Sequence, residues 1–224
     1  MTIWALSGFL GLPSDWDHLQ IDSLVSVDHN RFQCHSLEEW GSQFNHYIRQ
    51  QKNENNTLLG YSMGGRLGLY ALINDHSLWT SAIIVSGHPG IGEEVERKRR
   101  FANDQIWAQR FLTEDWQTLM HDWSQQPVFK NETFHFNRDE KDFQREQLAH
   151  TMLFASQGVQ SDLREQISQL PMPITWIVGE KDLRYVKLKD ELSFKNPSSK
   201  VVVIPNAYHR IPWSHPQQVL FQFP

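Results

Sequence analysis

The chain has 224 residues, which is enough for one domain with a sizeable core, or for one domain with an inserted cap. Lys and Arg number 21 against 26 Asp and Glu, so the formal net charge is −5, whereas a general nucleic-acid binder would carry a basic excess. The single cysteine, Cys34, excludes an intrachain disulfide, and no apolar run approaches the roughly 20 residues that a membrane span requires.

Short apolar runs punctuate the chain at strand length. The N-terminal run lacks a basic leading segment, so we expect a strand and a loop there, not a signal peptide, and a cytoplasmic protein. Runs that are apolar on both faces and rich in β-branched residues are typical of buried parallel strands. The predicted strands are Ile3–Leu6, Leu24–Val27, Thr57–Gly60, Ala82–Val85, Ile174–Val178 and Val201–Ile204.

Helical patterns lie between these runs. Ser36 is followed three residues later by Glu39, a capping-box pattern at the start of one helix. A second helical pattern follows directly after Ser62. Strands that alternate with helices predict an α/β fold: a mostly parallel, twisted sheet flanked by helices, with right-handed crossovers.

Residues 90–170 interrupt this alternation. They contain charge-dense helical patterns and no strand signal of comparable strength. A helical insertion between two strands of an α/β sheet usually covers the functional site. We therefore predict a core formed by residues 1–89 and 171–224, and a helical cap of residues 90–170 inserted after the fourth strand.

The sequence Gly60-Tyr61-Ser62-Met63-Gly64 joins the third predicted strand to a helix. A serine between glycines at such a junction is typical of a nucleophile elbow, in which the serine takes a strained backbone conformation and its hydroxyl projects above the sheet. The alternative is a plain structural turn. The context of strand before and helix after favours the elbow, so Ser62 is the candidate catalytic serine.

A catalytic serine needs a base, and the base needs an orienting carboxylate. In the order serine, acid, histidine, the acid follows a late strand, where Asp182 stands. Glu180 and Asp190 are the alternatives for this role. His209 follows the final strand and is the candidate base among 11 histidines.

Two backbone N–H groups are candidates for an oxyanion hole. Met63 begins the helix after the elbow, where N–H groups point out of the helix, and Phe9 lies in the loop after the first strand. The alternative for the second position is an ordinary glycine-containing loop.

Several segments resemble one family within the α/β-hydrolase fold, the 2-succinyl-6-hydroxy-2,4-cyclohexadiene-1-carboxylate synthases of menaquinone biosynthesis. The similarity runs over nearly the whole chain and is carried by "SGFLGLPSDW", "GYSMGGRLGLYAL", "SGHPGI", "RRFANDQIWAQRFL" and "DWSQQPVF". The last two segments lie in the predicted cap and are more specific than the elbow. Ser7 departs from the family's usual histidine, and Tyr208 from its usual glycine, which affects the oxyanion loop and the packing behind His209.

The resemblance implies roles for four more residues. Arg66 and Arg100 match arginines that bind substrate carboxylates, and Tyr61 and Trp123 match residues that line the site. Helical spacing supports the role of Arg66, which lies one turn from Ser62, because a buried guanidinium needs an anionic partner. The alternatives are a salt bridge within the fold for Arg66 and a solvated face for Arg100.

The activity implied by the resemblance is a lyase reaction. Pyruvate is eliminated from 2-succinyl-5-enolpyruvyl-6-hydroxy-3-cyclohexene-1-carboxylate, with Ser62 as the base that abstracts a ring proton. We expect a small polycarboxylate as substrate, no metal, no organic cofactor, and neither nucleic acid nor membrane as a partner. The alternatives are a carboxylesterase or thioesterase that uses the same triad, and a non-catalytic binding protein on the same scaffold.

Overall fold

The computed structural model describes residues 1–129, 131–132 and 134–223. Residues 130 and 133 belong to the predicted cap and residue 224 to the predicted core, and they lie outside the described residues. Six strands form one sheet in the order β2-β1-β3-β4-β5-β6, and every neighbouring pair is parallel. The strands are β1 (Thr2–Leu6), β2 (Leu24–Val27), β3 (Asn56–Tyr61), β4 (Ser81–Val85), β5 (Ile174–Gly179) and β6 (Lys200–Ile204). The predicted fold class and all six predicted strands are confirmed.

Alternation along the strands explains why the sheet is buried on both faces. Trp4 and Leu6 of β1 belong to one hydrophobic cluster, whereas Ile3 and Ala5 belong to a second cluster on the opposite face. Side chains of successive strand residues point to opposite faces, so a strand that is apolar at every position must be covered twice.

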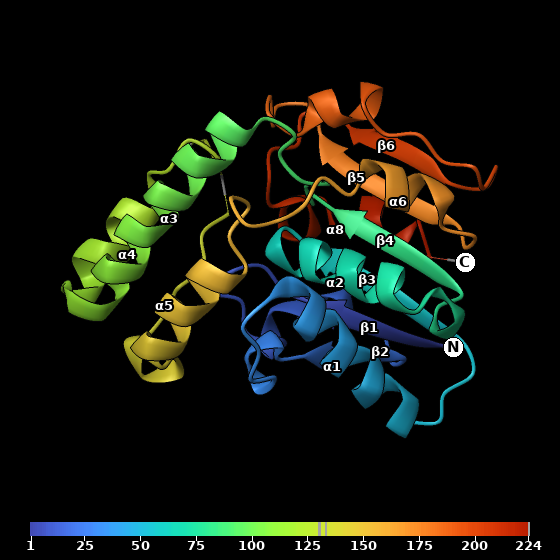
Figure 1. Ribbon diagram of the computed structural model, residues 1–224, viewed down its shortest axis with the longest axis horizontal. Coiled ribbons are helices and arrows are strands. Elements are labelled where there is room, and N and C mark those ends of the chain that lie inside the picture. The colour runs from blue at the N-terminus through green and yellow to red at the C-terminus, as the bar shows by residue number, and fades with distance from the viewer. Residues whose placement is uncertain (130, 133, 224) are drawn as a thin grey trace.

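Helices cover both faces of the sheet (Figure 1). On one face lie α1 (Leu37–Gln50), α2 (Met63–Asn74) and α6 (Arg164–Gln169), which contribute to the cluster around Trp4. On the other face lie the 3-10 helix η1 (Pro13–Leu19) and the short helices α7 (Ile211–Ser214) and α8 (Pro216–Leu220). The remaining 3-10 helices are η2 (His29–Arg31), η3 (His76–Leu78), η4 (Glu140–Asp142) and η5 (Val186–Asp190).

The capping box predicted at the N-terminus of α1 forms, with one difference in its hydrogen bonds. The Ser36 hydroxyl accepts the N–H of Glu39 at 3.1 Å, as the pattern predicts. The Glu39 carboxylate, however, accepts the N–H of His35 at 2.8 Å, one residue before the capping serine. Both bonds satisfy donors at the start of the helix, which fixes where α1 begins.

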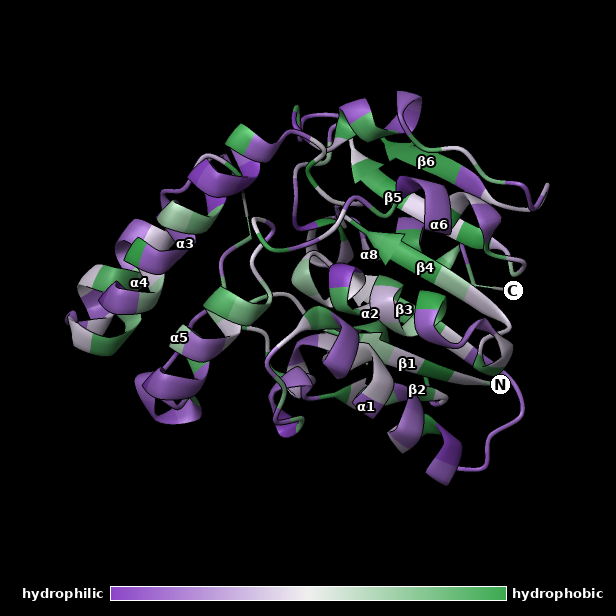
Figure 2. Cartoon of the chain, in the orientation of Figure 1, coloured by the Kyte–Doolittle hydropathy of each residue, from purple (hydrophilic) through white to green (hydrophobic). Residues whose placement is uncertain are grey.

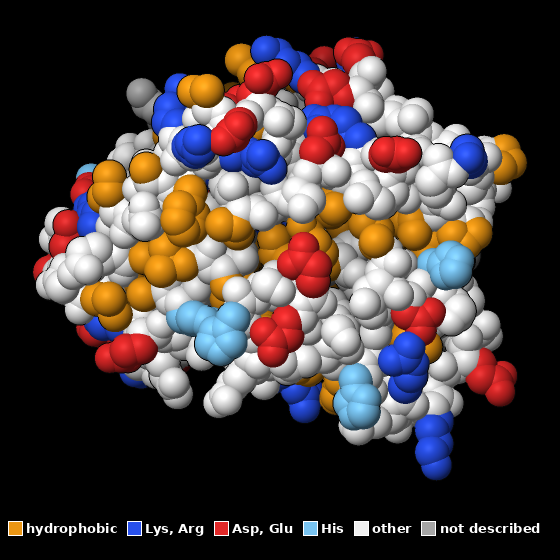
Figure 3. Space-filling view, viewed as in Figure 1, with side chains coloured by type: hydrophobic (Ala, Val, Ile, Leu, Met, Phe, Trp, Pro, Cys, Tyr) orange, Lys and Arg blue, Asp and Glu red, His pale blue; other side chains and the backbone are white. Residues whose placement is uncertain are grey.

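Three helices between β4 and β5 stand away from the sheet: α3 (Glu94–Thr113), α4 (Trp116–Ser124) and α5 (Arg145–Phe154). They share a small core of their own, which includes Trp107, Phe111, Leu119 and Met152. Hydrophilic and hydrophobic residues alternate along these three helices, whereas the central strands are largely hydrophobic (Figure 2). Lys and Arg lie beside Asp and Glu over α3 (Figure 3). One ion pair on this helix joins Lys98 Nζ to Glu94 Oε1 at 2.7 Å.

The segment that contains α5 is not one continuous helix: η4 precedes α5, and the chain after Phe154 is irregular as far as α6. Gly158, beyond the end of α5, packs so tightly that a Cβ would lie 2.6 Å from the Arg97 carbonyl oxygen. That close approach brings the end of this segment back against α3. The division into a core of 1–89 with 171–224 and a cap of 90–170 stays a prediction. Within the described ranges no helix has the length and apolarity needed to cross a membrane.

Candidate active site

The turn between β3 and α2 has the geometry predicted for an elbow. Ser62 lies between the two elements with φ 52° and ψ −113°, a backbone conformation that is costly for a residue with a side chain. A Cβ on Gly64 would lie 2.3 Å from the Leu6 carbonyl oxygen, and a Cβ on Gly60 would lie 2.6 Å from the Gly65 Cα. The two glycines therefore permit the close packing of strand, turn and helix that holds Ser62 in this conformation.

Three polar side chains from separate segments meet at this turn. His209 Nδ1 lies 2.7 Å from Asp182 Oδ2, and His209 Nε2 lies 3.1 Å from Ser62 Oγ. The Asp182 carboxylate accepts a hydrogen bond from the Nδ1–H of His209. Nε2 is then free to accept the proton of the Ser62 hydroxyl. Asp182 and His209 are both buried. This arrangement can activate the serine as a nucleophile or as a base.

The alternative acids do not reach the histidine. Glu180 accepts the N–H of Asn206 at 2.8 Å, and Asp190 lies at the end of η5. Asp182 reaches His209 because the chain turns directly after β5, where the Asp182 N–H donates to the Gly179 carbonyl at 3.1 Å.

The backbone N–H groups of Phe9 and Met63 are available beside the serine. Met63 is the first residue of α2, so its N–H has no acceptor within the helix. Among the hydrogen bonds of the described residues, none uses the Phe9 N–H. Leu10 adopts φ 60°, and the Gly11 N–H donates to the Gly8 carbonyl at 2.9 Å, so the Phe9 loop is a tight turn.

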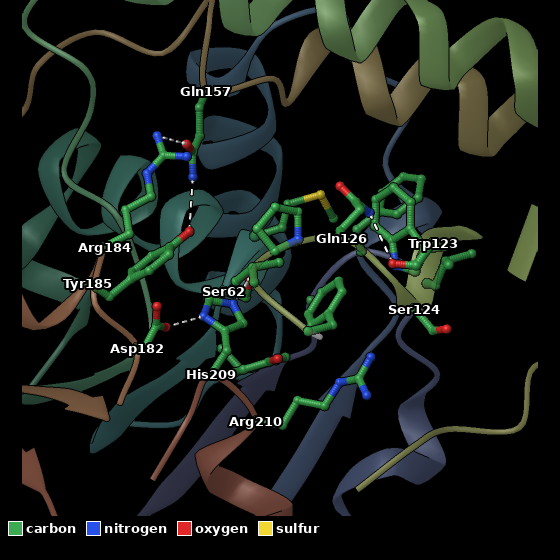
Figure 4. A pocket seen from close by; sticks show the side chains of 18 of the residues that line it. Ser62, Trp123, Ser124, Gln126, Gln157, Asp182, Arg184, Tyr185, His209 and Arg210 are labelled. Carbon is green, nitrogen blue, oxygen red and sulfur yellow. Dashed lines mark hydrogen bonds and ion pairs between the residues drawn. The ribbon is translucent and has the colours of Figure 1, made fainter. Parts of the chain in front are cut away.

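A cavity of about 840 Å³ opens above Ser62 (Figure 4). Its lining includes seven Lys or Arg and three Asp or Glu, although the whole chain has a net charge of −5. The cations are Arg66, Arg99, Arg100, Arg138, Lys181, Arg184 and Arg210. A cavity with this excess of positive charge favours an anionic ligand.

Arg66 lies one turn beyond Ser62 and is buried, with an exposed fraction of 6%. Its Nη1 donates to Gln160 Oε1 at 3.1 Å, and no carboxylate of the described residues lies within 4 Å of its guanidinium. Burial and then the neighbouring Arg100 lower the pKa of Arg66 to about 10, so the side chain stays cationic at neutral pH. The alternative of a salt bridge within the fold therefore has no partner among these residues.

Arg100 differs from Arg66 because it already has an acidic partner. Its Nε lies 2.8 Å from Asp104 Oδ2, and its Nη1 donates to Gln157 Oε1 at 3.1 Å. Asp104 is itself buried and also accepts the Ser156 hydroxyl at 2.7 Å. This network turns Arg100 toward the cavity, whereas Lys98 in the same basic run pairs with Glu94 on the exposed face of α3.

Tyr61 and Trp123 both line the cavity. The Tyr61 ring packs edge-on against Trp213 with centroids 4.7 Å apart, and burial raises the pKa of its phenol well above the usual value. The phenol therefore stays protonated. Trp123 lies against Phe9 with centroids 5.1 Å apart, so a residue of the cap helix α4 contacts the loop that carries one of the candidate oxyanion donors.

The two departures from the family pattern have local effects. The Ser7 hydroxyl lies 3.4 Å from the Leu12 carbonyl oxygen and so spans the Phe9 loop. Tyr208 lies beneath the Lys181 ammonium group, 5.5 Å from the ring centroid. Its backbone approaches β5, since a Cβ on Gly179 would lie 2.3 Å from the Tyr208 carbonyl oxygen.

Sequence reasoning missed three polar residues of the cavity. Gln157 accepts from both Arg100 and Arg184, and its amide donates to the Tyr185 hydroxyl at 3.2 Å. Arg210 follows His209 directly, but nothing in the sequence indicates that its side chain turns inward. The pairing of Asp104 with Arg100 could have been predicted, because the two residues are four positions apart on one helix. No cluster of three His, Cys, Asp or Glu that could hold a metal occurs among the described residues.

Comparisons with known proteins support one family. A family model described as the alpha/beta hydrolase fold matches residues 28–216. The 2-succinyl-6-hydroxy-2,4-cyclohexadiene-1-carboxylate synthase of Serratia proteamaculans is 28% identical over 91% of this chain and 80% of that protein. The synthase of the same name from Salmonella paratyphi B is 32% identical over 73% of this chain, and the match spans 64% of that relative, just under two thirds of its length.

A solved structure gives the same fold at low sequence identity. MenH from S. aureus superposes with a TM-score of 0.86 at 22% identity, covering 98% of this chain and 90% of that one. The superposition covers the cap helices as well as the sheet, because so little of this chain is left out.

Proposed function

This chain belongs to the alpha/beta hydrolase fold family, and from that premise we propose that it is a lyase of menaquinone biosynthesis. It eliminates pyruvate from 2-succinyl-5-enolpyruvyl-6-hydroxy-3-cyclohexene-1-carboxylate and releases 2-succinyl-6-hydroxy-2,4-cyclohexadiene-1-carboxylate. Two curated relatives carry the name of the synthase of that product. The substrate is a small molecule with three carboxylates, one on the ring, one on the succinyl chain and one on the enolpyruvyl group.

The observation that carries this proposal is the buried Arg66 beside Ser62. A guanidinium with an exposed fraction of 6% and no carboxylate partner among the described residues is costly to keep in an enzyme for neutral esters. It becomes favourable when a substrate carboxylate pairs with it. Arg66 and Arg100 then fix two carboxylates of the substrate, which orients the reacting ring carbon over Ser62.

The chemistry follows from the triad. The proton removed is on the ring carbon that bears the succinyl ketone, where a carbonyl group makes it acidic. Ser62 takes this proton and passes its own to His209 Nε2, which lies 3.1 Å away, while Asp182 orients the imidazole. The electron pair moves through the ring, and the bond from the ring to the enolpyruvyl oxygen breaks.

Negative charge develops on the succinyl carbonyl oxygen during proton removal. The N–H groups of Phe9 and Met63 stabilise that oxygen from the floor of the cavity. Trp123 and Tyr61 supply the apolar walls around the ring.

Pyruvate release tests the proposal directly. The substrate is generated in place by the enzyme that precedes this step, and pyruvate is followed by a coupled assay. Release well above the spontaneous rate, lost in Ser62→Ala, supports the lyase. Absence of release in the wild-type protein contradicts it.

Ester hydrolysis is the second candidate, because a serine 3.1 Å from a histidine and beside two free N–H groups is also what an acyl-enzyme mechanism needs. In that case the carbonyl of a small anionic ester or thioester takes the place of the ketone. Turnover of short activated esters without pyruvate release would favour this candidate.

A further inference from the structure

Arg210 is a cation in the cavity that the proposed mechanism does not use. It follows His209, precedes α7, and is buried with an exposed fraction of 6%. Figure 4 shows its side chain extending from the His209 segment away from Gln157 and Arg184, with Ser62 and His209 between them. The cavity therefore has cations on two opposite sides of the triad.

The guanidinium of Arg210 has aromatic and carbonyl contacts in place of an ion pair. Its Nη1 donates to the Phe134 carbonyl at 2.6 Å, and its Cζ lies 4.4 Å from the ring centroid of Phe129. Among the described residues no carboxylate lies within 4 Å of it. The neighbouring acid, Glu132, uses Oε1 to accept the backbone N–H of Arg210 at 2.6 Å.

Glu132 acts on the Arg210 guanidinium only through longer-range attraction, so no carboxylate of the described residues contacts it directly. A buried cation in this state gains stability when a ligand brings a negative charge into contact with it. One Nη1 bond and the ring contact leave further N–H donors of the guanidinium, which carries five in a planar fork. Such a fork matches a carboxylate with two parallel hydrogen bonds. The chemistry of Arg210 therefore fits a carboxylate that enters the cavity.

The opposite wall of the cavity carries three arginines that are available for the other carboxylates of the substrate. Arg100 and Arg184 both donate to Gln157, and Arg66 donates to Gln160. If this wall holds two of the three substrate carboxylates, the third extends past Ser62 toward Arg210. The only substituent that must leave the ring is the enolpyruvyl group, which carries its own carboxylate.

We infer that Arg210 binds the carboxylate of the departing enolpyruvyl group and retains it as pyruvate forms. This inference rests on the proposed lyase function. As the ring C–O bond breaks, its electron pair leaves with the enolpyruvyl oxygen, which gives pyruvate enolate, and protonation of that enolate gives pyruvate. Arg210 offsets the charge of the leaving group as that charge increases, so it acts on the transition state as well as on binding.

Arg210 also has contacts that could make it purely structural, since it joins Phe134 to the segment after His209. A structural role would affect all ligands of the cavity alike. A carboxylate site for the leaving group would affect pyruvate selectively. Product inhibition by pyruvate separates the two roles.

The experiment compares Arg210→Gln and Arg210→Lys with the wild type, using pyruvate release, product inhibition by added pyruvate, and calorimetric titration with pyruvate alone. Arg110→Gln is the matched control. Arg110 also lies over an aromatic ring, with its Cζ 4.4 Å from the Trp107 centroid, but it pairs with Glu114 and Asp122 and lies outside the cavity lining. Arg66→Gln tests the opposite wall.

Arg210→Gln should weaken pyruvate inhibition at least tenfold and lower kcat/KM for the enolpyruvyl substrate by about 10- to 100-fold, the usual range for a lost charged hydrogen bond. Arg210→Lys should recover part of the pyruvate inhibition and part of kcat/KM, because lysine keeps the positive charge but lacks the planar pair of N–H donors. Arg66→Gln should raise the KM for the substrate and leave the pyruvate inhibition constant within twofold. Arg110→Gln should leave both unchanged.

Two results obtained with an active lyase overturn the inference. One is a lyase that is inhibited by pyruvate equally in the wild type and in Arg210→Gln. The other is an equal loss of pyruvate binding in Arg66→Gln and Arg210→Gln, which would indicate a general structural effect. If the wild type releases no pyruvate from the substrate, the proposed function fails by itself, and the calorimetric titration then decides the site. Binding of pyruvate at least tenfold weaker in Arg210→Gln would keep Arg210 as a carboxylate site, and equal binding would remove it.

Discussion

The sheet side and the cap side of the cavity hold their functional groups in different ways. On the sheet side, backbone packing fixes the groups: Gly64 lies against the carbonyl oxygens of Leu6 and Ser7, and Ser62 is confined between β3 and α2. On the cap side, a chain of side-chain contacts runs from Arg100 through Asp104 to Ser156. We therefore expect the sheet side to position the reacting groups and the cap side to contribute to substrate binding.

The sharpest test of this comparison is Ser62→Ala. We expect pyruvate release to fall at least about 10⁴-fold, as for other serines that act with a histidine, and the free energy of unfolding to stay nearly constant because alanine keeps the same backbone conformation. Ser86→Ala is the control: that hydroxyl donates to the His209 carbonyl at 2.7 Å and does not face the substrate. Ser86→Ala should cost stability with a loss of turnover below tenfold. Comparable losses in both variants would contradict the role of Ser62.

A second test lies at the boundary between the two sides. Arg66→Gln should lower kcat/KM for the anionic substrate about 100-fold, because a charged hydrogen bond contributes about 1.5–3 kcal/mol. Hydrolysis of a neutral ester should change less than twofold, and urea unfolding should show equal or greater stability because a buried unpaired cation is removed. Equal loss on both substrates would mean that Arg66 holds the elbow helix in place.

A third test concerns how the stability of the sheet side depends on pH through the buried His88. The Gly90 N–H donates to His88 Nδ1 at 3.1 Å, so the neutral ring is the form that fits. Burial, and then the charges of nearby arginines led by Arg184, lower the pKa of His88 from 6.5 to about 3. The unfolded state therefore binds the proton more readily than the folded state between these two pH values, and stability falls as the pH falls through this window.

The expected loss from His88 is about 2 kcal/mol between pH 6.5 and pH 5, at roughly 1.4 kcal/mol per pH unit. His29 is also buried, with a pKa lowered to about 4 by burial, and should add to the slope. Urea unfolding across pH 4.5–7 measures it. His88→Asn should flatten the slope, whereas His121→Asn, at an exposed position of α4, should not. An unchanged slope in His88→Asn would contradict this assignment.

The smallest effect is expected on the cap side. Arg100→Gln should raise the KM about tenfold and leave kcat within threefold, since Arg100 is partly neutralised by Asp104 before substrate binds. Lys98→Gln, two residues away on the exposed face, should change KM less than twofold. A large drop in kcat in Arg100→Gln would show that the cap takes part in the chemical step, and the contrast between the two sides would then fail.

The sheet and the triad could be predicted because their signals are local. Six apolar runs match β1 to β6, and Asp182 and His209 each follow a strand whose end lies at the same edge of the sheet. The pairing of Arg100 with Asp104 could also have been predicted from their spacing of four residues. Whether the assigned residues carry the proposed chemistry stays a prediction.

The inward positions of Arg210 and Gln157, on opposite sides of the triad, could not be predicted. Arg210 is buried because Phe129 and Phe134, some 80 positions earlier in the chain, fold over it, and no local pattern encodes that contact. Gln157 lies between two arginines from different segments for the same reason. The close packing of Gly158 against Arg97 and Phe101 of α3 is another long-range contact that no local pattern encodes.

The positive φ of Ser62 has a consequence for laboratory evolution of this enzyme. Glycine adopts such a conformation without the cost that serine carries, so Ser62→Gly should gain about 1 kcal/mol of stability while it abolishes turnover. Selection for heat resistance alone would then favour loss of the Ser62 hydroxyl. Directed evolution of this protein for stability should therefore select for turnover in every round, because Ser62 is a position where substitution raises thermal stability and removes activity.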